Sequence, residues 1–134
     1  MASVIFDSYV EDSISGGIDL TNNNIMCALM DDQYFPLSTD VTFDNTNEIV
    51  GTGYTSGGKP ITGKLTISGY FKSAPVSWSG CVIATRWAVL YNASNSNRLV
   101  AAYDFGLVRR SRGGTFTVNW GSSGLLRHKR LTDA

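Results

Sequence analysis

The stretch Cys81-Val-Ile-Ala-Thr-Arg-Trp-Ala-Val-Leu-Tyr91 decides the fold class of this chain. Both alternating sets of residues along it are largely apolar, and many of them are β-branched or aromatic. This pattern predicts a strand, and a strand that is apolar on both faces is expected at the centre of a sheet. The polar run 92–97 then predicts a turn, and residues 99–105 predict the returning strand.

Shorter alternating stretches on either side predict further strands. Leu65 and Ile67 are expected on one half-buried face of their strand. Residues 18–20 and the four polar residues after them predict a hairpin with the strand that follows. The further strands are expected at 25–30, 64–68, 76–78 and 115–120. Loops or turns are expected at 31–48, 69–75 and 106–114, the last of these being basic.

The N-terminal segment carries the only helical pattern. Its apolar residues recur at spacings of three and four, which predicts a helix over residues 4–15. Ser3 is the expected N-cap, and Gly16-Gly17 is the expected stop because glycine readily adopts the left-handed conformation. The β-branched residues in the segment leave an initial strand as the alternative.

Composition supports one β-rich domain. The chain has 134 residues, which suits a single domain, and 16% of them are charged. Ser, Thr, Asn and Gly together account for 50 residues, a turn-rich composition typical of all-β proteins. We therefore expect a mainly β, single-domain antiparallel β-sandwich or barrel-like fold with one short N-terminal helix. The domain is expected to span residues 1–126, followed by a basic C-terminal tail at 127–134.

The formal net charge of zero conceals an asymmetry along the chain. Residues 1–48 contain nine acids and no lysine or arginine, whereas residues 49–134 contain two acids and all eleven basic residues. The neutral total argues against nucleic acid or a membrane surface as a direct partner. Two interpretations of the asymmetry stay open. Folding interleaves the segments so that the charges neutralise locally, or the subunit carries an acidic and a basic face that dock on its own copies or on a lattice.

Two groups of charged residues are the candidate partner-binding residues. The basic group has no interleaved aromatic residues that would form a stacking platform for nucleic acid. Arginine is favoured at protein interfaces, so we expect protein contacts for both groups, with a solvated loop and tail as the alternative. The basic group comprises Arg109, Arg110, Arg112, Arg127, Lys129 and Arg130, and the acidic group comprises Asp31, Asp32, Asp40 and Asp44.

Residues that carry catalysis or bind metals are sparse. The only histidine, His128, lies in the basic tail, and no Cys or His spacing fits a metal site. Adjacent acids such as Asp31 and Asp32 do not act as a general acid and base without a cleft and shifted pKa values. Asp104 is expected to bind backbone N–H groups or to pair with Arg86. We therefore predict no enzymatic activity, no cofactor and no metal.

The glycine-rich stretch 51–59 has two interpretations. Backbone N–H groups of such a loop hold phosphate where the loop opens a helix. Here the spacing differs from that of the ATPase loop, and Pro60 and a strand pattern follow. We therefore expect a bent loop that Tyr54 holds against the core.

Cysteine usage and the chain ends give weaker signals. Cys27 and Cys81 lie in apolar runs, which predicts two buried thiols, with a disulfide as the alternative. The N-terminal residues include acids and no long apolar run, so no signal peptide is expected. The apolar stretches are also too short for a membrane span.

Nine short motifs occur in a characteristic order along the chain. They are Phe6-Asp-Ser-Tyr9, Gly17-Ile-Asp-Leu20, Ile25-Met-Cys-Ala-Leu29, Gly51-Thr-Gly-Tyr-Thr-Ser-Gly-Gly-Lys59, Val76-Ser-Trp78, Ala84-Thr-Arg-Trp-Ala-Val-Leu-Tyr91, Ala102-Tyr-Asp-Phe-Gly106, Gly114-Thr-Phe-Thr117 and Gly124-Leu-Leu126. Over residues 4–126 the chain thereby resembles a family of small virion structural proteins of tailed bacteriophages. The basic tail from Arg127 onward departs from that family's pattern.

The resemblance implies a capsid decoration or cement protein at the capsid surface of a virion. Its implied partners are the major capsid protein or other virion proteins, and a homo-oligomer is expected. The alternative is a tail, head–tail junction or fibre-associated component, including one that binds a carbohydrate or a receptor. Trp78, Trp87 and Trp120 would then stack on sugars, but each lies on an alternating apolar face, so core positions are expected for all three.

Overall fold

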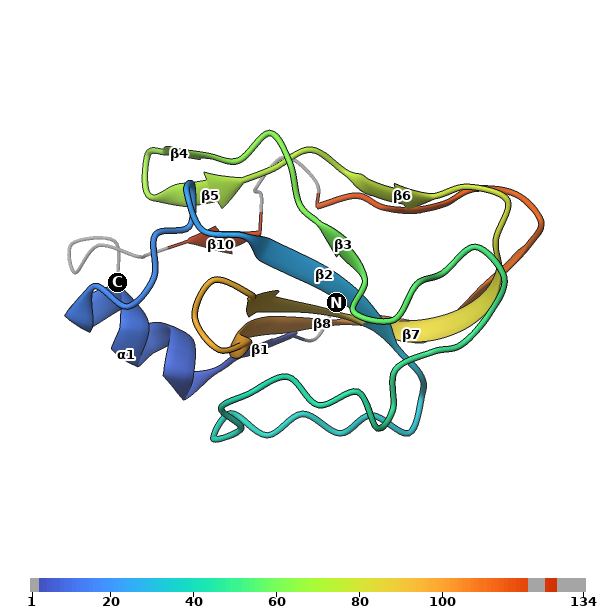
Figure 1. Cartoon of the computed structure of the whole chain (residues 1–134), viewed down its shortest axis with the longest axis horizontal. Coiled ribbons are helices and arrows are strands. Elements are labelled where there is room, and N and C mark those ends of the chain that lie inside the picture. Colours follow the sequence, from blue (N-terminus) through green and yellow to red (C-terminus); the bar gives the residue numbers. More distant parts are fainter. Residues whose placement is uncertain (1–2, 121–124, 128–134) are drawn as a thin grey trace.

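A five-stranded antiparallel sheet forms the centre of the computed structural model, which describes residues 3–120 and 125–127. Its strands, in spatial order, are β1 (Ser3–Ile5), β8 (Arg98–Arg112), β7 (Val82–Asn92), β2 (Ile25–Met30) and β3 (Lys59–Pro60) (Figure 1). The prediction that residues 81–91 form a central strand is confirmed, because β7 lies between β8 and β2.

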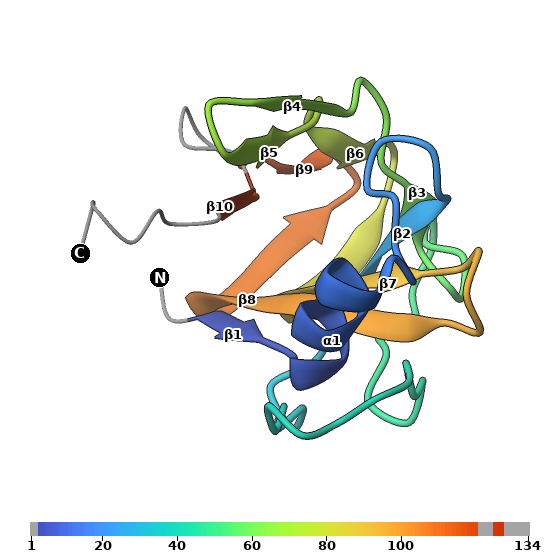
Figure 2. The same ribbon diagram turned by 90° about the vertical axis from the view of Figure 1, so that its left-hand side faces the viewer.

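Two smaller antiparallel sheets form a second layer over one face of the large sheet (Figure 2). One contains β10 (Leu126–Arg127), β5 (Tyr70–Lys72) and β4 (Leu65–Ile67) in that order, and the other pairs β6 (Val76–Trp78) with β9 (Phe116–Val118). The fold is thus mainly β and sandwich-like, as predicted, and no sheet of the described residues closes into a barrel.

The large sheet buries apolar side chains on both of its faces. Between the two layers, Leu90 belongs to a core cluster that also contains Trp78 of β6. On the opposite face, Val89 belongs to a second cluster, against which the half-buried Tyr34 and Phe43 pack. Successive side chains of a strand point to opposite faces, so the double-sided apolar pattern of β7 supplies both clusters.

The N-terminal segment forms a strand followed by a helix. The helix α1 spans Asp7–Ser15, so the predicted helix start at residue 4 and the predicted N-cap at Ser3 are wrong. The β-branched pair before Phe6 instead extends along β8 as β1. The predicted stop is confirmed, because Gly16 has a φ of 84° and the next N–H group closes on the carbonyl of Asp12. None of the helices in the described ranges has the length and apolarity that crossing a bilayer requires.

Two further predictions of local structure, a hairpin and a turn, are wrong. Residues 18–20 form no strand, so the predicted hairpin with residues 25–30 is wrong, and β2 pairs with β7 and β3 instead. The segment 69–75 contains β5, which returns along β4 after a turn at residues 68–69, so a continuous turn there is also wrong. Leu65 and Ile67 of β4, the side chains expected on a half-buried strand face, are 46% and 55% exposed.

The predicted basic loop at 106–114 is wrong as well, because β8 continues to Arg112. Arg109 is paired with Thr85, and Arg112 with Val82, at the end of the β7–β8 hairpin. The pairing is interrupted by a bulge, in which residues 105–108 of β8 stand opposite the single residue Arg86 of β7. Charged side chains and a glycine suggested a loop, but a strand accommodates charged residues wherever they face solvent.

Candidate contact surfaces

The acidic loop, residues 31–48, forms a cover on the face of the large sheet that the small sheets leave open. Phe43 stacks on Tyr91 of β7 with ring centroids 4.3 Å apart, and Tyr34 meets the edge of Trp87 at 5.7 Å. The N–H group of Leu99 donates a 2.7 Å hydrogen bond to a carbonyl of the loop. These contacts hold the loop flat against the sheet.

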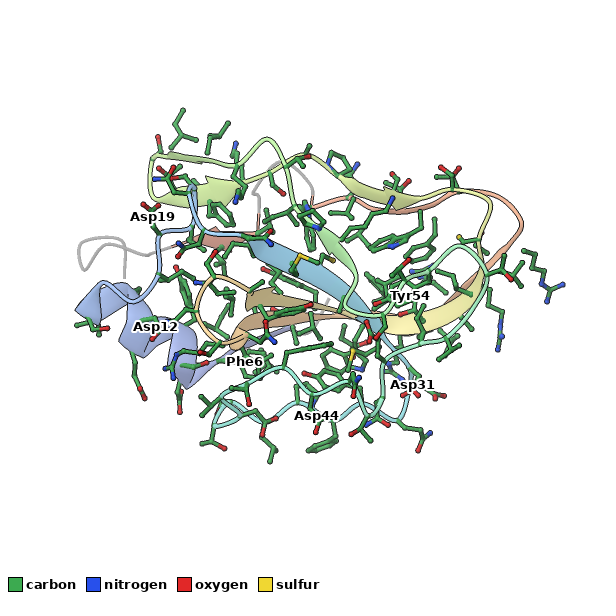
Figure 3. The ribbon with its side chains drawn as sticks, in the orientation of Figure 1. Phe6, Asp12, Asp19, Asp31, Asp44 and Tyr54 are labelled. Atoms are coloured by element: carbon green, nitrogen blue, oxygen red, sulfur yellow. The ribbon has the colours of Figure 1, made fainter. Side chains whose placement is uncertain are left out.

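The four candidate acids of this loop are held by local hydrogen bonds and take part in no ion pair within the described residues. Asp31 accepts the N–H group of Gln33 at 2.9 Å, and Asp40 accepts that of Leu37 at 2.9 Å. Figure 3 shows Asp31 and Asp44 at separate points along the loop, on the side away from the small sheets. Their negative charge is therefore available to a partner.

A cleft of about 380 Å³ in the acidic loop brings Asp40 and Asp44 together with Tyr34. Hydrogen bonds from the side chain and backbone of Thr46 hold the pKa of Asp44 below its usual value. Burial, and then the charges of both carboxylates, raise the pKa of the Tyr34 hydroxyl. The cleft therefore presents an ionised carboxylate, which suits it to bind a cationic side chain.

The last acid of the loop, Glu48, is buried and serves the fold. Its carboxylate accepts hydrogen bonds from the Tyr54 hydroxyl at 2.5 Å, from Ser56 at 2.9 Å and from the N–H group of Gly57 at 2.7 Å. The prediction that Tyr54 holds the glycine-rich loop against the core is confirmed. The sequence analysis did not assign this role to Glu48, which precedes Tyr54 by six residues.

The arginine end of the β7–β8 hairpin comprises Arg109, Arg110 and Arg112, all of them exposed. Exposed apolar side chains lie beside them, Leu107 in the bulge of β8 and Val82 opposite Arg112. None of the three arginines takes part in an ion pair within the described residues. Of the tail residues in the predicted basic group, Arg127 lies in β10, where its backbone pairs with Tyr70, and Lys129 and Arg130 lie outside the described residues.

The bulge that leads to the arginine end is fixed by the predicted pair of Arg86 and Asp104. The guanidinium group donates two hydrogen bonds to the carboxylate, at 3.0 and 3.2 Å, and the carboxylate also accepts the N–H group of Gly106. Arg86 is the main cause of a lowered pKa at Asp104. This pair belongs to the framework that positions the arginine end.

An aromatic cleft of about 440 Å³ lies between β8 and β9. Its aromatic walls are Tyr103, Phe105, Phe116 and Trp120, and Arg109 also lines it. The prediction that all three tryptophans are core residues is confirmed for Trp78, which is 1% exposed. Trp87 is half-buried beneath Tyr34, and Trp120 is half-buried in the cleft, where the centroid of its ring lies 5.2 Å from that of Tyr103.

The charge asymmetry of the sequence is only partly neutralised by folding. Arg98 pairs with Asp12 at 2.8 Å and approaches Glu11 at 3.9 Å, which joins the acidic helix to the basic half of the chain. In contrast, no ion pair of the described residues links the acidic loop to the arginine end. Arg98 therefore neutralises part of the charge of α1, whereas the acidic loop and the arginine end form no ion pair with each other in the part of the chain that the structure describes.

Cys27 and Cys81 are buried free thiols, as expected. Burial raises the pKa of the Cys27 thiol to about 12. Within residues 3–120 and 125–127, no three His, Cys, Asp or Glu side chains gather as the ligands of a metal ion would.

Comparison of the chain with protein-family models, with curated proteins and with solved structures gives no match.

Proposed function

We propose that this protein is a structural component of a bacteriophage virion, a decoration or cement protein that binds and stabilises the assembled head. Its motifs resemble those of small phage virion proteins over residues 4–126. The observation that carries the proposal is the pair of exposed surfaces of opposite charge, the acidic loop and the arginine end, whose charges the described residues leave unpaired. Such a subunit suits docking on a repeating protein surface.

Stabilisation of the head follows from mass action. A protein that binds the assembled shell more tightly than the free capsid protein shifts the equilibrium toward the shell. The proposed partners are the major capsid protein or other virion proteins, and the proposed location is the capsid surface. Because the contacts include exposed charges, we expect salt to weaken the binding.

The carboxylates of the acidic loop favour binding over catalysis. A general acid at neutral pH needs a raised pKa, whereas hydrogen bonds from Thr46 lower the pKa of Asp44. The other carboxylate of that cleft, Asp40, accepts a backbone hydrogen bond from Leu37. The proposal therefore includes no enzymatic activity and no cofactor.

Co-sedimentation with heads that lack the protein tests this proposal. The purified protein should sediment with assembled heads and bind free capsid protein more weakly. Reversing all three charges of the arginine end (R109E, R110E and R112E) should weaken head binding about tenfold or more, the scale of interface charge pairs. The matched control is the single reversal K72E on β5, compared with the single reversals R109E, R110E and R112E, because each of these changes the net charge equally. Equal binding to heads and to free capsid protein would contradict the proposal.

A further inference from the structure

An exposed aromatic side chain on the acidic loop is the least covered aromatic group in the described structure. Phe35 is 80% exposed, and Leu37 and Val41 nearby in the loop are about half exposed. A group of exposed apolar side chains with a polar surround marks an interaction site. Here the surround is acidic, because Asp32 and Asp40 lie on either side of Phe35 in the sequence.

The aromatic cleft between β8 and β9 has the complementary character. Its walls are mainly aromatic, its volume of about 440 Å³ accommodates an aromatic ring, and Arg109 lines it. Phe105 meets Phe116 edge-on, with ring centroids 6.1 Å apart, an arrangement in which a further aromatic ring finds both faces and edges to contact. Of the arginine end, Arg109 is the member that lines this cleft and gives it a positive charge.

We propose that the acidic loop of one copy docks at the aromatic cleft of a second copy. The ring of Phe35 enters the cleft, and the carboxylates around it face Arg109, the arginine that lines the cleft. A second copy is the occupant because this chain itself carries the apolar and acidic group that an aromatic cleft beside arginines requires. The inference rests on the proposed function, since it assigns a partner to the same two charged surfaces.

The fold prevents a copy from filling its own cleft. The acidic loop covers one face of the large sheet, whereas β9 belongs to the layer on the other face. Each docked pair of copies therefore leaves one free Phe35 and one free cleft. A contact of this heterologous kind continues until a ring closes, or grows as a filament.

The oligomeric state of the purified protein tests the inference without any capsid. Light scattering and sedimentation should show concentration-dependent association. The association should weaken but persist at about 1 M salt, where charges are screened beyond about 3 Å and the apolar contact remains. Phe35→Ser should weaken association by about 10- to 100-fold, the range expected for removing one buried aromatic side chain. The matched control is Val50→Ser, because Val50 is 96% exposed and lies outside both surfaces.

Mixing two defective variants distinguishes this contact from a symmetric one. Phe35→Asp keeps the cleft and loses the ring, while Arg109→Glu keeps the ring and alters the cleft. Each alone should be monomeric, and the mixture should form a 1:1 heterodimer and nothing larger. A wild-type protein that stays monomeric up to about 1 mM, a range of very weak affinity, would overturn the inference. So would a Phe35→Ser variant that associates like Val50→Ser, or a cleft that binds a saccharide while the protein remains monomeric.

The outcome is separable from that of the proposed function. A monomer that binds assembled heads refutes docking between copies and leaves the decoration role standing. An oligomer that depends on Phe35 but does not bind heads supports docking between copies and refutes the decoration role.

Discussion

The Tyr54 hydroxyl donates a 2.5 Å hydrogen bond to the buried carboxylate of Glu48 and accepts one of 3.0 Å from the N–H group of Leu29. The glycine-rich loop, the end of the acidic loop and strand β2 therefore meet at one phenol oxygen. Burial, and then the bond to Glu48, raise the pKa of this phenol. The acidic loop is thus fixed from its C-terminal end by a polar contact and along its length by aromatic contacts.

Removing one partner from this network should destabilise the fold. Tyr54→Phe leaves Glu48 with one donor fewer, and Leu29 without its acceptor, so we expect a loss of about 1–3 kcal/mol in the free energy of unfolding. Urea denaturation measures this loss of stability. Asp32→Asn is the control, because Asp32 is exposed, and it should be close to neutral. Equal stabilities for the two variants would refute the role given to Glu48.

Gly58 is required by a close backbone approach. An added Cβ atom would lie 1.9 Å from the carbonyl oxygen of Cys27, whereas at Gly80, which also has a positive φ, it would meet nothing within 4 Å. Gly80→Ala therefore carries only the backbone strain, on the order of 1 kcal/mol. Gly58→Ala carries a steric clash as well and should lower the melting temperature much further. Similar melting temperatures for the two variants would show that β3 does not pair with β2 as described.

The pair of Asp104 and Arg86 predicts a pH dependence of stability. The pKa of Asp104 is lowered in the folded state, so its contribution is present above the ordinary carboxyl pKa of about 3.9 and is lost as the pH falls through the lowered value. Asp104→Asn should be less stable than the wild type at pH 7 and equally stable at strongly acidic pH. Thermal unfolding across this range measures the difference. A constant difference at every pH would contradict the assignment.

Both cysteines should be protected from modification in the folded protein. Cys27 is fully buried and its pKa is raised to about 12, and Cys81 is also buried. A thiol reagent at mildly alkaline pH should therefore label neither residue before unfolding, and both in denaturant, because the reactive species is the thiolate. Ser38→Cys, at an exposed position, is the positive control and should react at once. Recovery of fewer than two thiols from the denatured wild type would indicate a disulfide.

The sequence predicted the centre of the fold better than its periphery. The double-sided apolar pattern of 81–91 identified the central strand, because burial on both faces leaves a local signature. The start of the helix was misjudged, because Val4 and Ile5 fit a helical stripe and a strand edge equally well, and only pairing with β8 decides between them. The bulge opposite Arg86 was invisible for the same reason, since it depends on the register of two strands.

The partner-binding role of the candidate residues stays a prediction, and the structure adds the surroundings of each residue. Asp104 was correctly assigned to Arg86, because a charged residue within an apolar strand needs a partner. No role was predicted for Glu48, because its neighbours in the sequence give no sign of the three hydrogen-bond donors that residues 54–57 supply. The aromatic cleft lies between β8 and β9, which belong to different sheets, and the packing of one sheet on another leaves no local pattern in the sequence.

The measurement that tests the central claim most directly is an electron cryo-microscopy map of the phage particle that contains this chain. We predict density of this sandwich-like fold on the outer surface of the head, with the acidic loop or the arginine end against the major capsid protein or against a neighbouring copy. Density confined to the tail, or a complete particle without this protein, would contradict the account.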